Sequence, residues 1–377
     1  MIAHRLWLSQ AISGLPWFRS GHNWRKQWPQ NRLLGQGQVK RPSIGDVARQ
    51  AGVSTATVSR AINAPETVTE KTRRKVQEAV DALHYVQSET ARNFKKQRAN
   101  TVLVVANDIG NIYYSEIFRG VQRRAEASSY STIIANPSPG GTQDLILSNL
   151  RNAKVDGVII LSGHEIADHD LSLLQQLYSG TPPIVAMSEE RGYMRVPHIL
   201  IDNERAGYIA GRHLIEMGHT RIGHAYGPHR TPVRRARANG LRRALTEAGV
   251  AINDTWFFEG GFSAIGGRAS AQSFLSLKDR PTAVFCANDE AAMGFISQLH
   301  RYGISVPGDL SVMGFDDIVL ADTYVPGLST VHQPKEEMGR HAMNLVLDII
   351  EARTKSDLPI IELPVHLVPR ESVTRIT

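Results

Sequence analysis

The residues best suited by type and spacing to chemistry with another molecule lie in SIGDVARQAGVSTATVSRAIN, from Ser43 to Asn63. The second half of this segment predicts a short helix from Thr55 to Ile62. Its outward face carries small polar side chains and one guanidinium: Thr55, Ala56, Thr57, Ser59 and Arg60. An arginine can donate two hydrogen bonds to guanine, and a threonine offers both a hydroxyl and a methyl group. We therefore expect this face to bind DNA in the major groove, with further contacts from Ser54, Asn63 and Tyr85.

The elements that position this face can be read from the same segment. Ser43 followed by Asp46 is a capping-box-like start for a first helix, and Gly52 supplies the left-handed residue that ends it. Ser54 can then cap the second helix. Apolar residues at helical spacing would pack back onto the first helix: Val53, Val58 and Ile62. A helical hairpin in an unrelated core is the alternative, but the agreement of caps, glycine and polar face favours a helix-turn-helix.

Charge is distributed unevenly along the 377 residues. Residues 1–100 hold 17 of the 43 Lys and Arg but only 6 of the 36 Asp and Glu, whereas the remainder is mildly acidic. A basic head on an acidic body is typical of a nucleic-acid reader joined to a sensor. The single cysteine, Cys286, excludes a disulfide within the chain and favours a reducing cytoplasm. We expect no membrane span, because no apolar run is long enough.

The first 40 residues contain four of the five tryptophans and show no clear periodicity. We interpret residues 1–40 as a disordered extension or as upstream sequence translated from a misplaced start. The alternative is an additional DNA-contacting arm through Arg25, Lys26 and Arg32. A DNA-binding domain is expected over residues 41–87, with a third helix from Thr69 to Leu83. The basic segment over residues 88–100 is expected to be a linker that orders on binding.

From Thr101 the pattern changes to apolar runs alternating with amphipathic helices. The runs read as strands: TVLVVAND, STIIAN, DGVIILS, PIVAM, HILIDN, RIGHAYG, WFFEGG, TAVFCAN and LSVMGFDD. Helices are expected between or after them: Tyr114 to Ala127, Asp144 to Asn152, Arg205 to Met217, Arg235 to Ala248, Ala264 to Leu277, Glu290 to Tyr302 and Lys335 to Glu351. This alternation predicts an α/β fold with parallel sheets covered on both faces.

About ten strands exceed one doubly wound sheet, so the body over residues 101–377 is predicted to contain two such subdomains. We expect the first to comprise roughly residues 101–202 plus 334–363, and the second residues 203–333 plus the C-terminal tail. Ligands of open α/β sheets bind beyond the C-terminal ends of the strands. Two sheets with those ends facing each other would form a cleft for a small molecule.

These motifs together resemble the lactose/galactose repressor family of bacterial transcription regulators. DVARQAGVSTATVSRAIN and VTEKTRRKVQEAVDALHY resemble the family's DNA-binding head. HILIDNERAGYIAGRHLIEMGHTRIGHAYGP, PTAVFCANDEAAMGF, VPGDLSVMGFDDI and LSTVHQPKEEMGRHAM resemble its effector-binding body, which is of the periplasmic-binding-protein type. The resemblance covers about residues 41–375, and within the family the cytidine- and purine-responsive repressors are nearest.

The resemblance implies a homodimeric repressor on a pseudo-palindromic DNA operator, read by Thr55, Ala56 and Arg60. Residues 88–96 match a hinge helix that enters the minor groove, where the family usually has a leucine that wedges between base steps. This chain has Phe94 there, followed by Lys95, so its kink geometry and hinge coupling need not follow the family's. Effector binding would close the cleft and change the spacing of the two hinges.

Several positions match the family's effector contacts. Tyr113 and Tyr114 match an aromatic pair that stacks on a ring, although such a pair at a helix start is often only core. Arg237 matches an arginine directed at ligand oxygens, and Asp316 an acid that accepts ligand protons; a solvated basic face and a turn cap are the respective alternatives. Phe262 and Asn288 follow equivalent strands. Glu189 replaces an aromatic lid residue of the purine type, so we expect a nucleoside, sugar or other hydroxylated effector.

Enzyme signals do not hold together. Gly261 and Gly266 have phosphate-loop spacing, but the lysine and the serine or threonine that complete such a loop do not follow them. HEIADHD, from His164 to Asp170, resembles a metal cluster, yet its histidines are five residues apart and it follows a strand as a polar loop. We therefore expect no catalytic residue, no metal and no cofactor.

Overall fold

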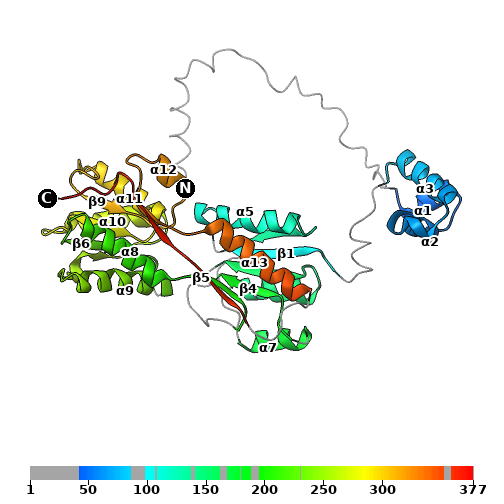
Figure 1. Ribbon diagram of the computed structural model, residues 1–377, viewed down its shortest axis with the longest axis horizontal. Coiled ribbons are helices and arrows are strands. Elements are labelled where there is room, and N and C mark those ends of the chain that lie inside the picture. Colours follow the sequence, from blue (N-terminus) through cyan, green and yellow to red (C-terminus); the bar gives the residue numbers. More distant parts are fainter. Residues whose placement is uncertain are drawn as a thin grey trace, which may run out of the picture. The chain divides into compact units, whose positions relative to one another are not determined.

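The computed structural model describes residues 42–85, 98–106, 108–136, 141–161, 168–178, 180–187, 195–229, 231–351 and 358–376. The chain divides into two compact units, Met1–Ser88 and Glu89–Thr377. Their described parts are a small helical head and a larger α/β body (Figure 1). The predicted fold class is confirmed.

The head is built from α1 (Ile44–Ala51), α2 (Thr55–Asn63), the 3₁₀ turn η3 (Pro65–Thr67) and α3 (Glu70–Ala82). The predicted capping box is present, with Ser43 accepting from the Asp46 amide while Asp46 bonds back to Ser43. Gly52 ends α1 with φ 65°, a left-handed conformation that favours glycine. The three helices bury one small apolar cluster: Val47, Ala48, Ala51, Val58, Ala61, Val76 and Ala79. Because α1 and α2 share this core, the outward face of α2 is left for solvent or a partner.

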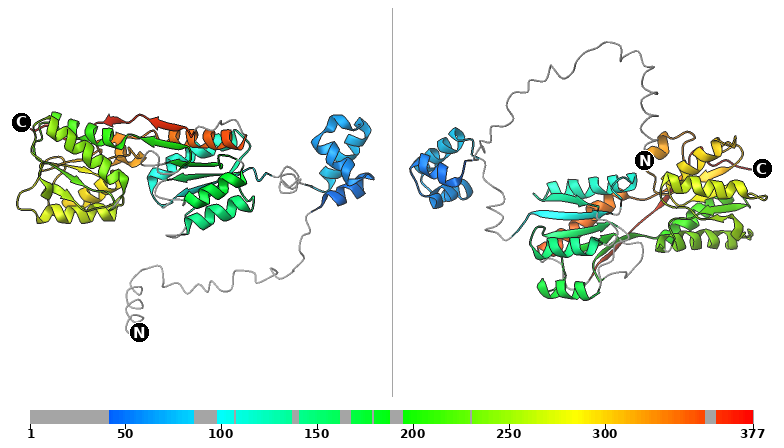
Figure 2. Two further views of the ribbon diagram at one scale, coloured as in Figure 1. Left: turned by 90° about the horizontal axis from the view of Figure 1, so that it is seen from below. Right: turned by 180° about the vertical axis from the view of Figure 1, so that it is seen from behind.

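The first half of the body is a six-stranded parallel sheet in the order β11-β5-β4-β3-β1-β2. Its strands are β1 (Thr101–Ala106), β2 (Ser131–Ala135), β3 (Gly157–Leu161), β4 (Ile184–Met187), β5 (His198–Ile201) and β11 (Ile360–Leu363). Helices α5 (Ile112–Glu126) and α13 (Lys335–Ile350) cover one face, and α6 (Thr142–Arg151) and α7 (Asp168–Leu177) cover the other. Figure 2 shows the sheet between these helix layers. We call this half the first lobe.

Strand alternation explains this layering. In β1, Val102 and Val104 pack toward α5 and α13, whereas Leu103 and Val105 pack toward α6 and α7. Where α5 crosses α13, a Cβ on Gly120 would lie 2.0 Å from the carbonyl oxygen of Glu336, so only glycine permits this approach. The first lobe is therefore a three-layer sandwich in which the central strands β1, β3, β4 and β5 are buried, while the edge strands β2 and β11 are partly exposed.

The second half of the body, the second lobe, has a four-stranded parallel sheet in the order β7-β6-β8-β9. Its strands are β6 (Ile222–Ala225), β7 (Phe257–Phe258), β8 (Ala283–Cys286) and β9 (Ser311–Met313). Helices α8 (Asn203–Glu216) and α9 (Pro232–Glu247) pack on one face, and α10 (Ala264–Ser276) and α11 (Asp289–His300) on the other. A 3₁₀ turn, η4 (Asp254–Trp256), precedes β7, and the short α12 (Val319–Thr323) follows β9.

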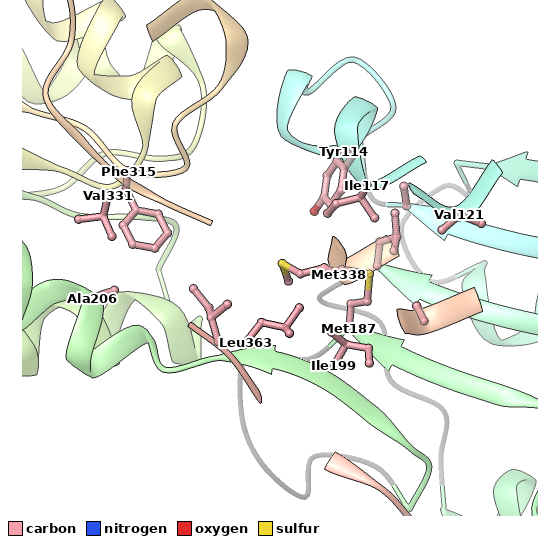
Figure 3. Close-up of a cluster of buried hydrophobic side chains, with 14 of the residues drawn as sticks. Tyr114, Ile117, Val121, Met187, Ile199, Ala206, Phe315, Val331, Met338 and Leu363 are labelled. Atoms are coloured by element: carbon pink, nitrogen blue, oxygen red, sulfur yellow. The ribbon is translucent and has the colours of Figure 1, made fainter. Parts of the chain in front are cut away.

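The chain passes between the lobes at three places: after β5, before α13 and after β11. Near these crossings β10 (Thr330–His332) pairs antiparallel with β12 (His366–Val368). One apolar cluster includes residues of both lobes, and Figure 3 shows labelled members, among them Tyr114, Met187 and Met338 from the first lobe and Ala206, Phe315 and Val331 from the second. The crossings thus lie beside shared core rather than in exposed linkers.

Several predicted boundaries need correction. The helix expected from Tyr114 begins at Ile112, because Asn111 caps it, and the helix expected from Arg235 begins at Pro232. The interpretation of HEIADHD as a polar loop is wrong at its end, since Asp168 opens α7. Residues 1–41 and 86–97, which include the N-terminal extension and most of the predicted hinge, lie outside the described residues.

Candidate functional site

The outward face of α2 is the candidate DNA-binding surface. Thr55, Ala56 and Arg60 are exposed, while Val58 and Ala61 on the opposite face are buried. Arg60 Nε donates to the Ala56 carbonyl oxygen at 3.5 Å, so the guanidinium lies along the helix surface. The three positions predicted to read bases therefore share one accessible face.

The other predicted contacts flank this face and stabilise the helix. Ser54 Oγ accepts from the Thr57 amide at 3.1 Å, which caps the N-terminus of α2. Asn63 Nδ2 donates to the Ser59 carbonyl oxygen at 2.9 Å in the last turn. Tyr85 is half-buried against the head's core. Phe94 and Lys95 lie outside the described residues.

The candidate ligand site is a cavity of about 660 Å³ lined by both lobes. This volume is in the range of sites for small organic molecules. The six predicted ligand-binding residues all line it: Tyr113, Tyr114, Arg237, Phe262, Asn288 and Asp316. They come from loops or helices that follow different strands, as the strand-end rule for open α/β sheets requires.

Arg237, on α9, is 6% exposed and is held by the second lobe. Its Nε donates to Asn203 Oδ1 at 3.0 Å, and its Nη1 donates to the Ala287 carbonyl oxygen at 2.5 Å. The guanidinium lies 3.5 Å from the centroid of the Phe315 ring. These contacts fix its position at the cavity wall.

Asp316 is 5% exposed and has a φ of 107°, in the left-handed region that non-glycine residues rarely occupy. Gln333 Nε2 donates to Asp316 Oδ1 at 2.6 Å. Burial raises the pKa of Asp316 to about 6, and the charges of Arg237 and Lys335 act in the opposite direction. A strained, buried carboxylate at a cavity wall is more typical of a binding group than of a turn cap.

A chain of polar contacts joins the two lobes beside Asp316. Tyr113 Oη, in the first lobe, donates to Gln333 Oε1 at 3.4 Å, and Gln333 in turn holds Asp316. Lys335 is buried, donates to the carbonyl oxygens of Asp317 and Gln333 at 2.9 and 3.3 Å, and lies 3.6 Å from Glu116 Oε2 on α5. Movement of one lobe against the other would have to change these contacts.

The aromatic pair lies at the start of α5. Tyr113 and Tyr114 have ring centroids 5.2 Å apart at an interplanar angle of 66°, an edge-to-face arrangement. Tyr114 is 8% exposed and belongs to the shared core, whereas Tyr113 is half-buried. Tyr113 is thus the member of the pair better placed to meet a ligand.

Asn288 stabilises the local structure around the cavity. Its Oδ1 accepts from the Ala291 amide at 2.9 Å and caps α11, and its Nδ2 donates to the Phe262 carbonyl oxygen at 2.9 Å. It is 3% exposed. Asn288 therefore positions the Phe262 loop at the cavity as well as lining it.

Sequence reasoning missed further polar residues that line the same cavity: Asp108, Asn111, Asn203, Thr231, Glu290 and Gln333. Each follows the C-terminal end of a strand or caps the helix after it. Asp316 was found through its match to the family's motif. The strand-end rule, applied to every strand, would also have found Asp108, Asn203 and Gln333.

Within the described residues, no group of three or more His, Cys, Asp or Glu side chains could hold a metal ion. His169 is exposed and lies 3.3 Å from the buried Asp170, while His164 and Glu165 lie outside the described residues. Among the helices that the structure describes, none is long and apolar enough to cross a membrane.

A helix-turn-helix head joined to two parallel-sheet lobes around a cavity defines a DNA-binding regulator with a sensor domain. Comparison with known families agrees: residues 43–88 match the bacterial regulatory proteins of the lacI family, and residues 212–373 match a periplasmic binding protein-like domain. The chain is 34% identical over 337 residues to the HTH-type transcriptional repressor PurR of Vibrio vulnificus. The matched region covers 89% of this chain and 99% of the relative. The chain therefore belongs to the LacI family of transcription regulators and is not an enzyme.

Solved structures with the same organisation support this assignment. The lac repressor dimer bound to operator and the anti-inducer ONPF matches with a TM-score of 0.77 at 26% identity, covering 89% of this chain and 100% of that one. The transcriptional regulator CelR in complex with cellobiose matches with a TM-score of 0.65 at 31% identity, covering 88% of this chain and 100% of that one. The predicted family is thus confirmed by both the head and the body.

Proposed function

We propose that this chain is a cytoplasmic repressor that binds a pseudo-palindromic operator as a homodimer and is controlled by a small hydroxylated effector, a nucleoside or a sugar. Residues 41–87 form the DNA-binding domain, residues 88–100 the hinge with Phe94 and Lys95 at the minor groove, and residues 101–377 the effector-binding and dimerisation domain. The observation that carries this proposal is the convergence of six predicted ligand-binding residues on one cavity.

The chemistry of the cavity wall supports a hydroxylated effector. Carboxylates, amides and a guanidinium supply both acceptors and donors for hydroxyl groups. Tyr113 and Phe262 supply aromatic surface on which a sugar or a base can stack. The related CelR structure contains cellobiose, a hydroxylated molecule without a charged group, which agrees with this ligand class.

The proposed control is conformational. An effector between the lobes would contact Tyr113 on one side and Asp316 on the other, and so would bias the Tyr113–Gln333–Asp316 chain of contacts. A ligand shifts such an equilibrium only through its different affinities for the two states. The shift would change the spacing of the two hinges in the dimer and hence the fit of both heads to the operator.

The test has two parts. A thermal-shift screen of nucleosides and sugars should give at least one ligand whose stabilisation grows with concentration. The same ligand should change the affinity of the full-length chain for an operator selected from random-sequence duplexes. A ligand that stabilises the chain without changing operator binding would reject the proposed control.

A further inference from the structure

Among the residues that the structure describes, the cavity wall carries more negative than positive side chains. Among the described residues that line it, Asp108, Glu290 and Asp316 are acids, and Arg237 is the one base. Neither Asp108 nor Glu290 forms an ion pair with another residue that the structure describes. An anionic ligand group would therefore meet two carboxylates without salt-bridge partners of their own.

Arg237 is already engaged by the protein. Its contacts with Asn203, the Ala287 carbonyl oxygen and the Phe315 ring hold the guanidinium against the second lobe. Its charge also faces the buried Asp316. A phosphate bound there would compete with these contacts and would approach Asp316 as well.

The N-terminus of α5, a natural position for an anion beside the cavity, is filled by the protein. The Glu290 carboxylate lies near the Ile112 amide, which lowers the pKa of Glu290 against the effect of burial. The Tyr113 amide donates to Asn111 Oδ1 at 2.9 Å, and the Tyr114 amide donates to the Asn111 carbonyl oxygen at 3.1 Å. Two of the first three amides of α5 thus have hydrogen-bond partners, and the remaining one lies near a carboxylate from the opposite lobe.

Glu290 and Asp108 line the same cavity from different lobes. Asp108 follows β1 and accepts from the Gly110 amide at 2.9 Å, while Glu290 lies in the first turn of α11. Burial and the negative charge of Asp108 raise the pKa of Glu290, while the nearby Ile112 amide lowers it. A further negative charge would add to this repulsion, whereas a hydroxyl group could donate to either carboxylate.

We infer that Asp108 and Glu290 form a charge filter, which admits hydroxylated effectors without an anionic group and rejects their phosphorylated forms. This inference rests on the proposed role of the cavity as the effector site. The effector is then a free sugar or nucleoside. The class of reaction that ends the signal transfers the terminal phosphoryl group of a nucleoside triphosphate to one effector hydroxyl and releases the nucleoside diphosphate and a proton.

The first experiment uses inorganic phosphate as the probe, so it does not depend on the identity of the effector. Full-length wild type, the double variant Asp108→Asn with Glu290→Gln, and the surface variant Asp279→Asn are titrated with phosphate against chloride of matched ionic strength. Asp279 is the control because it is exposed, pairs with Arg221 and does not line the cavity. Melting temperature and isothermal calorimetry report binding.

We expect saturable phosphate binding in the double variant and none in wild type or Asp279→Asn. If the double variant is folded and gains no phosphate binding, the filter is refuted. Glu290→Gln alone is measured beside it, because the single change leaves Asp108 in place and should give a smaller gain. Saturable binding to wild type that the double variant leaves unchanged would also refute the filter.

The second experiment compares matched pairs: ribose and ribose 5-phosphate, glucose and glucose 6-phosphate, adenosine and its 5′-monophosphate. Wild type should prefer an unphosphorylated member by roughly tenfold or more, because Glu290 is half-buried whereas Asp108 is exposed and its charge is partly screened by solvent. The double variant should lose most of this preference. Tighter binding of a phosphorylated member to wild type would refute the filter, and the N-terminus of α9, which has no side-chain cap, would then hold the phosphate.

The two experiments separate this inference from the proposed function. If a phosphorylated member binds tightly and changes operator binding, the filter fails while effector control stands. If the phosphate titration gives the expected result but no ligand of either kind changes operator binding, the filter stands while effector control fails.

Discussion

The face of α2 and the cavity of the body differ in how the chain builds them. The side chains of α2 come from nine consecutive residues, only two of which are buried, and one cap and one small core position them. The cavity draws Tyr113, Arg237 and Asp316 from separate strand ends of two sheets, and two of the three are at least nine-tenths buried. A surface that meets a large partner can be encoded locally, whereas a site that encloses a small one requires the whole topology.

This contrast predicts separable functions. Changes on α2 should weaken operator binding and leave ligand binding intact, and changes in the cavity should do the reverse. Variants of each region test whether DNA binding and ligand binding can be changed independently.

Asp316→Ala should give the largest effect. Truncating a buried, hydrogen-bonded carboxylate at the cavity should cost about 2–5 kcal/mol of ligand binding. Calorimetry with the strongest ligand from the thermal-shift screen measures this loss. Asp254→Ala, an exposed acid in the same lobe, is the control and should bind like wild type. An unchanged titration for Asp316→Ala would remove this residue from the site.

The pH dependence of folding stability should report the burial of Asp316. Since its pKa rises from 3.8 to about 6 on folding, the folded state holds this proton more tightly than the unfolded chain does. The resulting stabilisation is fully present below pH 3.8 and is lost as the pH rises through about 6, by at most roughly 3 kcal/mol.

Asp316→Asn should abolish this pH-dependent contribution to folding stability. The melting temperature of the ligand-free full chain should then fall less than that of wild type between about pH 4 and pH 7. Asp254→Asn is again the control and should follow the wild-type curve. Parallel curves for wild type and Asp316→Asn would show that this carboxyl does not titrate in that range.

Arg60→Ala should weaken operator binding by about 1–3 kcal/mol and relax sequence preference, while binding to random DNA falls much less. Fluorescence anisotropy with both duplexes measures the difference. Arg74→Ala is the matched control because Arg74 is exposed on α3 and pairs with Glu78. Equal losses on the two duplexes for Arg60→Ala would assign Arg60 to phosphate contact alone.

Glu336→Gln should give the smallest effect. Glu336 on α13 pairs with Arg119 and Arg123 on α5, but all three side chains are more than two-fifths exposed, so the network should contribute at most about 1 kcal/mol to stability. Urea unfolding measures it. A larger loss would mean that the α5–α13 contact depends on these charges rather than on apolar packing.

The contrast between the locally encoded face of α2 and the assembled cavity also explains how well each region can be predicted from the sequence. The caps and the glycine of the head act over three or four residues, so Ser43, Gly52 and Ser54 located the helices within a residue. In the body, the predicted starts of α5 and α9 are two and three residues too late. Asn111 caps α5 and Pro232 opens α9, and the prediction used neither signal.

The cavity shows a second limit of prediction from a single sequence. Asp316 was found through a motif, but Glu290 and Asp108 were not, because their importance comes from lining one cavity from two different lobes. A single sequence gives the ends of the strands but not which ends face each other. That information depends on how the chain crosses between sheets, which the parallel order β11-β5-β4-β3-β1-β2 makes visible.

The central claim is that a ligand in the body's cavity controls DNA binding by the head. Its most direct test is the operator affinity of the full-length chain at physiological salt, measured with and without the strongest screened ligand, for wild type and Asp316→Ala. We predict that the ligand changes operator affinity for wild type at least tenfold, about 1.4 kcal/mol of coupling, and leaves Asp316→Ala unchanged. The same ligand response in both proteins, or none in wild type despite saturable ligand binding, would contradict the claim.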